Sequence, residues 1–262
     1  MRIVQLAGGF LVLVLCAGLA QAHLVKEIET KKQLRVCMWP DYFGISYRNP
    51  RSGELQGIDI SMSQELAKDL GVSLRYVETN FARVIADLES RKCDIAMMGV
   101  GVTPDRAARV DFSQPYLRSD VYAVILKSNT SITRWEDLDL PGRVISVQKG
   151  TFMEPLMQRT LKNAELRIAQ RTAERERDVE SGRADAFITD YPYSRRMLAN
   201  TDWANVIAPS QPIAPIDYAY AVPKGEEVWV ARINEFLSKT KTDGRLEKYA
   251  RQFDLLPILV RD

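Results

Sequence analysis

Short runs rich in apolar and β-branched residues alternate with amphipathic segments along most of the chain, and this alternation constrains the fold more than any other feature. In the first half we expect strands at residues 34–39, 72–78 and 93–98 and helices at residues 59–71 and 81–92. Gly71 ends the first of these helices, as a C-cap glycine does. The β-α-β-α-β order predicts an α/β fold with a mostly parallel sheet flanked by helices.

A second set of the same kind begins near residue 121. We expect strands at residues 121–127, 143–148, 166–170, 185–190 and 218–223, and helices at residues 152–162, 173–182, 226–240 and 243–252. Two similar sets predict two lobes, with residues 23–119 plus 217–262 in lobe 1 and residues 120–216 in lobe 2. The chain would then leave lobe 1 near Ser119 and return near Asp217, through two crossover strands.

The first 22 residues have the pattern of a cleavable signal peptide. Arg2 precedes an apolar run at residues 6–19, and Ala20-Gln21-Ala22 forms an A-x-A cleavage site. This pattern predicts export to the periplasm and a mature start at His23, at a flexible terminus.

Charge and composition exclude several classes of function. The chain has 36 basic and 34 acidic residues, and removal of residues 1–22 takes away only Arg2, which leaves a net charge of about +1. Nucleic-acid binding needs a strongly basic face, so we expect no nucleic-acid partner. With a single histidine, His23, we expect neither a zinc site nor a Ser-His-Asp triad. We expect no metal and no cofactor.

Two cysteines of the predicted mature chain, Cys37 and Cys93, leave two alternatives open. An exported protein favours a disulfide between them. Both also lie in or beside apolar runs, where a free cysteine packs as a small hydrophobic residue.

The stretch GVGVTPDR at residues 99–106 follows a predicted buried strand. Gly99 and Gly101 would allow close approach of the backbone to a ligand, and Thr103 is suited to cap a helix that begins at Pro104. The helix start and Arg106 could together bind a carboxylate. The alternative is a capped helix whose arginine pairs with a surface carboxylate such as that of Asp111.

Two further strand ends have a similar composition. Gly150 and Thr151 follow the strand at residues 143–148, and Asp190 ends the strand at residues 185–190. Asp190 alone is equally well explained as a helix N-cap. Because ligands of open α/β sheets bind at the carboxyl ends of strands, the three sites together suit a zwitterion. Its carboxylate would face Arg106 and its ammonium group would face Asp190.

The order of these motifs resembles the family 3 extracellular solute-binding proteins, which deliver amino acids to ABC importers. The resemblance covers nearly all of the predicted mature chain and rests on LRVCMWPDY, GELQGIDISMSQELAKDLG, CDIAMMGVGVTPDRAARVDFSQPYL, WEDL, VQKGT, SGRADAFITD and DGRLEKYARQF. It implies a hinged, two-lobed type II periplasmic-binding-protein fold, a monomer, and an ABC transporter permease as partner. It also implies that Arg106 binds the ligand carboxylate, that Asp190 binds the α-ammonium group, and that Tyr42 and Phe81 bracket the ligand side chain.

The chain departs from the family pattern at several of these positions. Gly99 and Gly101 stand where relatives often have hydroxyl residues, and Phe152 stands where many have a second threonine. Trp39 replaces an aspartate that relatives use for cationic amino acids. An aromatic pocket with Trp39 and Phe152 suits a lysine- or arginine-like side chain poorly. We therefore expect a small carboxylate-bearing solute, an amino acid or a related compound, whose identity the sequence does not give.

Two other functions use the same fold. The chain also resembles exported cyclohexadienyl dehydratase, which converts prephenate or arogenate to an aromatic product. That enzyme has a glutamate two residues after the threonine of the Gly-Thr motif, where this chain has Met153, and Glu154 lies one residue further on. A ligand-sensing protein that acts through a separate signalling partner is the remaining alternative.

Overall fold

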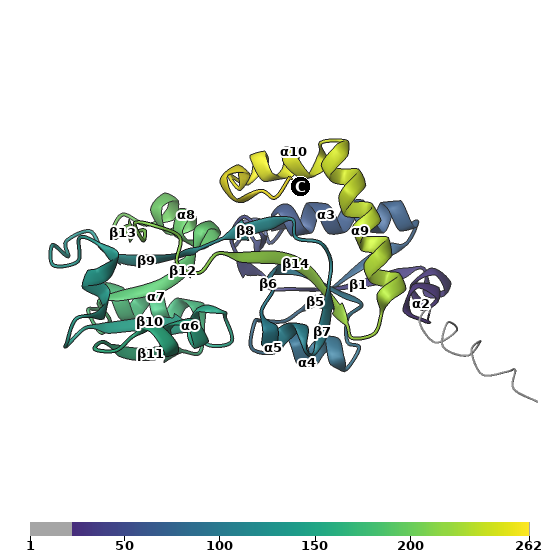
Figure 1. Ribbon diagram of the computed structural model, residues 1–262. Helices are drawn as coiled ribbons and strands as arrows, with labels where there is room; N and C mark the ends of the chain where they lie inside the picture. The colour runs from purple at the N-terminus through teal and green to yellow at the C-terminus, as the bar shows by residue number, and fades with distance from the viewer. Residues whose placement is uncertain (1–22, 262) are drawn as a thin grey trace, which may run out of the picture.

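The strands predicted from apolar runs form two separate sheets in a computed structural model that describes residues 23–261. The predicted signal peptide, residues 1–22, lies outside the described residues. Figure 1 shows the two sheets side by side, each with its own helices, and the strands β8 and β14 running between them. The predicted two-lobed α/β architecture is therefore confirmed.

The sheet of the first lobe has the order β5-β1-β6-β14-β7, with β8 paired to β14. Its strands are β1 (Gln33–Met38), β5 (Ser73–Glu78), β6 (Ile95–Gly101), β7 (Val110–Phe112), β8 (Leu117–Ser119) and β14 (Ile216–Pro223). The strands joined by helices, β1, β5 and β6, are parallel, whereas β14 is antiparallel to its neighbours. A small sheet of β2 (Asp41–Tyr42), β3 (Ser46–Arg48) and β4 (Leu55–Gln56), which we did not predict, follows β1.

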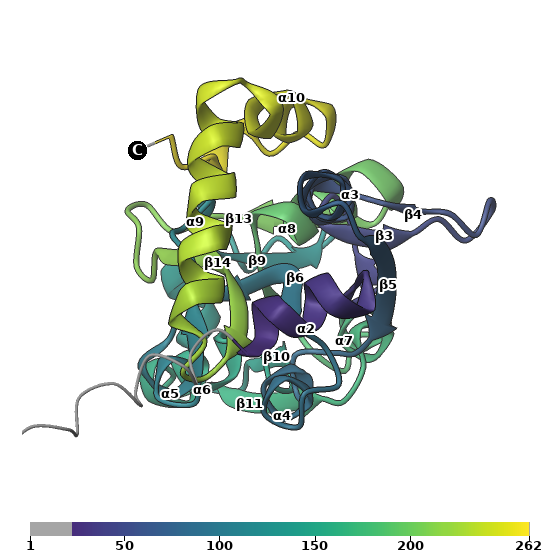
Figure 2. The same cartoon turned by 90° about the vertical axis from the view of Figure 1, so that its right-hand side faces the viewer.

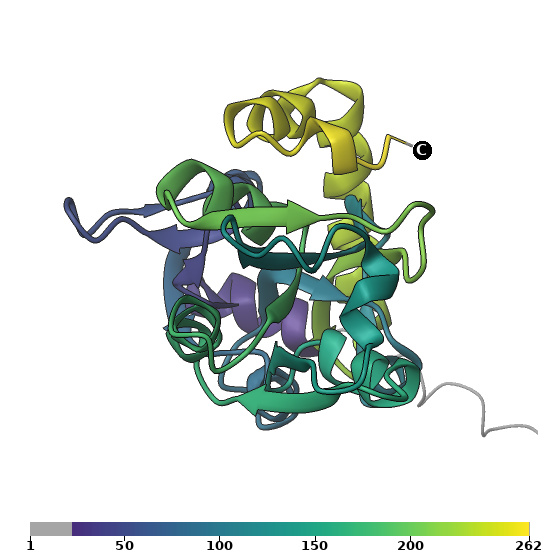
Figure 3. The same cartoon turned by 90° about the vertical axis from the view of Figure 1, so that its left-hand side faces the viewer.

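The sheet of the second lobe has the order β11-β10-β12-β9-β13. Its strands are β9 (Val121–Leu126), β10 (Val144–Gln148), β11 (Glu165–Ala169), β12 (Ala186–Asp190) and β13 (Ala204–Ile207). Here too the helix-connected strands β10, β11 and β12 are parallel, and β9 runs antiparallel to β12 and β13. Figure 3 shows this lobe facing the viewer.

Helices cover both sheets. The first lobe has α2 (His23–Lys31), α3 (Ile58–Leu70), α4 (Val84–Glu89), α5 (Pro104–Ala107), α9 (Glu227–Thr242), α10 (Arg245–Gln252) and the 3₁₀ helix η2 (Leu256–Ile258). The second lobe has the 3₁₀ helix η1 (Trp135–Asp139), α6 (Met153–Thr160), α7 (Thr172–Glu180) and α8 (Tyr191–Asn200). Figure 2 shows α2, α3, α4 and α9 around the sheet of the first lobe. No helix within residues 23–261 is long and apolar enough to cross a membrane.

Two local predictions are wrong. The chain from His23 is helix α2, because Leu24 and Ile28 are buried in the core. The strand expected to end at residue 98 continues to Gly101, because β14 pairs with it there. The helix predicted after Thr103 begins at Pro104 as expected, and this helix, α5, is a single turn because the chain re-enters the sheet as β7 from Val110.

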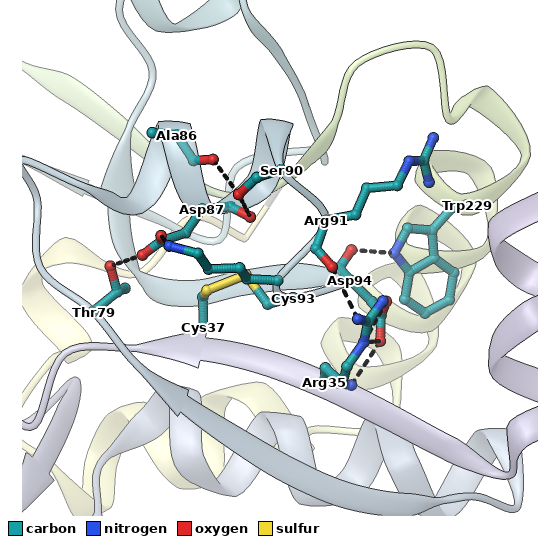
Figure 4. The surroundings of a disulfide bond; sticks show 11 residues. Arg35, Cys37, Thr79, Ala86, Asp87, Ser90, Arg91, Cys93, Asp94 and Trp229 are labelled. Carbon is teal, nitrogen blue, oxygen red and sulfur yellow. Dashed lines mark hydrogen bonds and ion pairs between the residues drawn. A yellow bond between two sulfur atoms is a disulfide. The ribbon is translucent and has the colours of Figure 1, made fainter.

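Cys37 and Cys93 form a disulfide, so the first of the two alternatives is correct. Figure 4 shows the bridge between β1 and the segment that precedes β6. Both cysteines are also fully buried, as their apolar surroundings indicated. The next residue, Asp94, accepts hydrogen bonds from the Arg35 backbone N–H at 2.7 Å and from Arg35 Nη2 at 2.5 Å, and its carbonyl oxygen accepts from Trp229 Nε1 at 3.0 Å. The bridge therefore lies in a buried part of the first lobe, beside residues that hydrogen bonds join to β1 and α9.

Candidate functional site

A narrow pocket with a cavity volume of about 20 Å³ lies between the two lobes. The first lobe and β14 contribute Trp39, Tyr42, Phe81, Gly99, Gly101, Arg106 and Tyr218, and the second lobe contributes Gln148, Thr151, Phe152, Met153, Arg175, Thr189, Asp190 and Tyr193. All predicted site residues except Thr103 and Gly150 line it. Those two line an adjoining outer groove.

Arg106 is held at the junction of the lobes by backbone carbonyl groups. Thr103 Oγ1 accepts from the Arg106 backbone N–H at 3.3 Å and caps α5 as expected. Arg106 Nη1 donates to Gly101 O at 2.8 Å in the first lobe, and Nη2 donates to Gly150 O at 2.9 Å in the second. Burial lowers the pKa of Arg106 to about 10, so the guanidinium group stays charged at neutral pH.

The guanidinium group of Arg106 has no carboxylate partner among the described residues. Asp111, the partner that we considered, forms an ion pair with Lys224 at 2.7 Å instead. The Arg106 guanidinium carbon lies 5.8 Å from the centre of the Phe81 ring. The charge of Arg106 is thus buried and available to a carboxylate that enters the pocket.

Asp190 caps a helix, as one of its two interpretations predicted, and it also lines the pocket. Its Oδ1 accepts from the Tyr193 backbone N–H at 3.2 Å, at the start of α8. Its Oδ2 accepts from the Tyr218 hydroxyl at 2.5 Å and from the Tyr42 hydroxyl. Burial, followed by the charge of Asp190, raises the pKa of both tyrosines well above 10, so both hydroxyls are protonated and donate. The contact with Tyr42 joins the two lobes.

Gly99 and Gly101 have structural functions that a larger side chain would prevent. Gly99 has φ +62°, and a Cβ atom there would lie 2.9 Å from the Tyr42 ring. Its backbone N–H donates to Asp59 Oδ2 at 2.9 Å, so this amide is not free to replace the hydroxyl groups of relatives. A Cβ atom at Gly101 would lie 2.7 Å from the Ile216 side chain, and the carbonyl group of Gly101 accepts from Arg106.

Asp59 lies in the core behind this turn. It is fully buried, and its Oδ2 also accepts from the Tyr116 hydroxyl at 2.7 Å. Burial raises the pKa of Asp59 to about 7, although hydrogen bonds from Tyr116 and Gly99 oppose the shift.

At the Gly-Thr motif the two lobes meet with very little space. Gly150 has φ +78°, and a Cβ atom there would lie 2.5 Å from the backbone of Ala82 in the first lobe. The Gly150 N–H donates to Glu154 Oε2 at 2.6 Å, and the Thr151 hydroxyl donates to Gln148 O at 2.8 Å. The Gly150 N–H is therefore already bonded within the second lobe, whereas the Gly150 carbonyl oxygen accepts a hydrogen bond from Arg106 of the first lobe.

An aromatic wall closes one side of the pocket. The ring centres of Trp39 and Tyr42 lie 5.4 Å apart, those of Trp39 and Phe81 lie 5.4 Å apart, and those of Tyr42 and Phe81 lie 5.8 Å apart. Phe152 of the second lobe also lines the space. The aromatic character that we expected from Trp39 and Phe152 is present in the pocket.

Sequence reasoning missed Gln148, Arg175, Thr189, Tyr193 and Tyr218, and it considered Met153 only as the counterpart of the dehydratase glutamate. Gln148, Thr189 and Tyr218 lie on predicted strands, where nothing in the local pattern separates a pocket residue from a core residue. Arg175 lies on a helix with many charged residues, and its sequence neighbours give no sign that it is buried. The described residues contain no group of three or more His, Cys, Asp or Glu side chains that could hold a metal ion.

Comparison with known proteins identifies the family of this chain. Residues 34–254 match the model of the bacterial extracellular solute-binding proteins, family 3. The chain belongs to this family.

Family 3 relatives include proteins named for binding and one named for catalysis. The L-cystine-binding protein TcyJ of Escherichia coli is 24% identical over 250 residues, which cover 94% of this chain and 93% of that protein. The cyclohexadienyl dehydratase of Pseudomonas aeruginosa is 28% identical over 230 residues, which cover 87% of this chain and 85% of that enzyme. Membership of family 3 therefore does not by itself separate binding from catalysis.

Solved structures confirm the type II periplasmic-binding-protein fold. An ancestral amino acid-binding protein, described as a precursor of cyclohexadienyl dehydratase, has a TM-score of 0.80 at 32% identity and covers 87% of this chain and 98% of its own. The amino acid ABC transporter substrate-binding protein AbpA of Streptococcus pneumoniae, bound to L-arginine, also has a TM-score of 0.80, at 26% identity, and covers 87% of this chain and 96% of its own.

Proposed function

We propose that this chain is a periplasmic solute-binding protein that captures a small amino acid, or a related carboxylate, between its lobes and delivers it to an ABC importer. The observation that carries the proposal is the buried guanidinium group of Arg106, which bonds to carbonyl groups of both lobes and has no carboxylate partner among the described residues. A ligand carboxylate would complete its hydrogen bonds, and Asp190 would receive the ammonium group. Residues 1–22 would direct export, and the monomer would dock on a permease.

Binding of the twenty amino acids, measured by isothermal titration calorimetry, tests this function. For the best ligand, Arg106→Ala should weaken binding by at least about 30-fold, because the loss of one partner of a buried charge pair costs about 2 kcal/mol or more. Arg109→Ala is the matched control, since Arg109 is exposed and pairs with Glu89 at 2.5 Å outside the pocket. Equal affinity in the wild type and Arg106→Ala would refute the carboxylate assignment.

Dehydratase activity is the second candidate, because the cyclohexadienyl dehydratase relative and the ancestral structure are both similar to this chain. The resemblance places the catalytic glutamate at Met153, which lines the pocket with an apolar side chain. Glu154 lines the outer groove and bonds to the Gly150 amide. Dehydration needs a general acid at the leaving hydroxyl, and these positions supply none, so binding is favoured. Loss of prephenate absorbance on addition of the protein would reverse this choice.

A further inference from the structure

A second buried guanidinium group, that of Arg175, lines the same pocket as Arg106. Arg175 lies on α7 of the second lobe and is 3% exposed. Its Nη1 donates to Ile188 O at 3.2 Å, and its Nε is buried without a hydrogen-bond partner. A buried cation with unpaired N–H groups is costly, so this site is suited to receive an acceptor from the pocket.

The acidic residues close to Arg175 on α7 are bonded to other arginines. The ion pairs are Arg171–Glu174 at 3.0 Å, Arg196–Glu176 at 2.9 Å, Arg167–Asp178 at 2.8 Å and Arg183–Asp178 at 2.9 Å. Within residues 23–261, no carboxylate forms an ion pair with Arg175. These three carboxylates are therefore paired with arginines other than Arg175, which lines the pocket.

Two aromatic rings hold the Arg175 guanidinium group in place. Its central carbon lies 4.2 Å from the centre of the Tyr193 ring and 4.9 Å from that of the Phe187 ring. Cation–π contacts of this kind favour the charged side chain and restrict its orientation. They do not occupy the Nε–H group, which has no hydrogen-bond partner and would be satisfied by a ligand carboxylate.

The pocket lining has two guanidinium groups and a single carboxylate, that of Asp190. We infer that the ligand has a second anionic group, bound by Arg175, and is therefore an acidic amino acid. This inference rests on the proposed function, in which Arg106 takes the α-carboxylate and Asp190 the ammonium group. Because Arg106 belongs to the first lobe and Arg175 to the second, such a ligand joins the lobes through its two acidic groups. A cationic side chain would meet two positive charges without added compensation.

Acid and amide pairs of equal shape test the inference. The wild-type protein should bind L-glutamate or L-aspartate at least about tenfold more tightly than L-glutamine or L-asparagine in isothermal titration calorimetry. Arg175→Gln should abolish this preference and should weaken binding of the acidic ligand by about 30-fold or more, with a much smaller effect on the amide. Arg175→Lys should keep part of the preference because it keeps the charge. Arg177→Gln is the matched control, two residues along α7 and exposed.

The outcomes separate this inference from the proposed function. If the wild type binds neutral or basic amino acids more tightly than acidic ones, the inference about Arg175 is wrong and the binding function stands. If Arg175→Gln keeps the wild-type preference for the acid, the inference is also wrong. If no amino acid binds to the wild type, the proposed amino-acid function itself fails. Melting temperatures of all variants show which of them are folded, and Arg175→Lys serves as the second test if Arg175→Gln is not.

Discussion

Replacement of Asp59 by asparagine should remove a large pH dependence from the stability of the protein. Asp59 is fully buried, and burial raises its pKa from 3.8 to about 7. The folded state therefore binds a proton more tightly than the unfolded chain does. Between about pH 4 and pH 7 the free energy of unfolding should fall as pH rises, and at pH 7 and above the contribution is lost.

The magnitude follows from the size of the shift. A displacement of about 3 pKa units at about 1.36 kcal/mol per unit corresponds to about 4 kcal/mol between the two ends of this range. An asparagine at Asp59 resembles the protonated acid. Its carbonyl oxygen can accept from the Gly99 N–H and the Tyr116 hydroxyl, as Oδ2 does. Its NH₂ group would replace Oδ1, which is buried without a partner, and the nearby Tyr220 hydroxyl can accept from it.

Urea unfolding of the wild type and of Asp59→Asn from pH 4.5 to pH 8.5 measures the effect. The difference between the two proteins is the relevant quantity, because carboxylates with lowered pKa values, such as Asp137 and Glu65, act in the opposite direction in both. Asp59→Asn should be close to the wild type at the acid end and several kcal/mol more stable at pH 8. Parallel pH profiles, or a variant that is less stable at pH 8, would show that Asp59 is charged in the folded state and that the reasoning is wrong.

Two more predictions concern the disulfide and the contact between the lobes. The bridge closes a loop of 56 residues, so replacement of both Cys37 and Cys93 by alanine should cost about 4 kcal/mol and lower Tm by about 10 °C; an unchanged Tm in calorimetry would contradict this. Gly150→Ala should weaken ligand binding by about tenfold or more, because its Cβ would lie 2.5 Å from Ala82 and force the lobes apart. Gly142→Ala is the control, because it has a similar φ of +82° with no atom within 4 Å, and equal losses of affinity in the two variants would refute the steric argument.

Local sequence patterns predicted most of the helices and strands, because an apolar run or a capping residue determines the structure of the few residues next to it. Thr103 caps α5 and Asp190 caps α8 with side chains that the sequence already showed. The length of α5 was not predictable locally, because it depends on the return of the chain to the sheet at Val110.

The site was predictable only where a motif marks it. Arg106 follows a recognisable glycine-rich turn, whereas Arg175 is one of several arginines in a charged helix. Arg175 differs from these arginines because it lines the pocket while the acidic residues near it pair with other arginines. One of those partners, Arg196, comes from a different helix, and the local sequence does not show this pairing. The sequence also left undecided whether Cys37 and Cys93 are bonded. The distance between them is set by the pairing of β1 with β6, which is a contact between segments far apart in the sequence.

The close approach of Gly150 to Ala82 has a consequence for how this protein can diversify. At this point the two lobes approach each other backbone to backbone, so main-chain dimensions limit how closely they can lie, while the side chains of Arg106 and Tyr42 bond across to the second lobe. The pocket side chains that do not join the lobes can therefore change, and with them the solute, while the backbone limit on the spacing of the lobes stays the same. If the proposed function holds, a permease that recognises that spacing would accept descendants of this protein with new ligands without any change of its own.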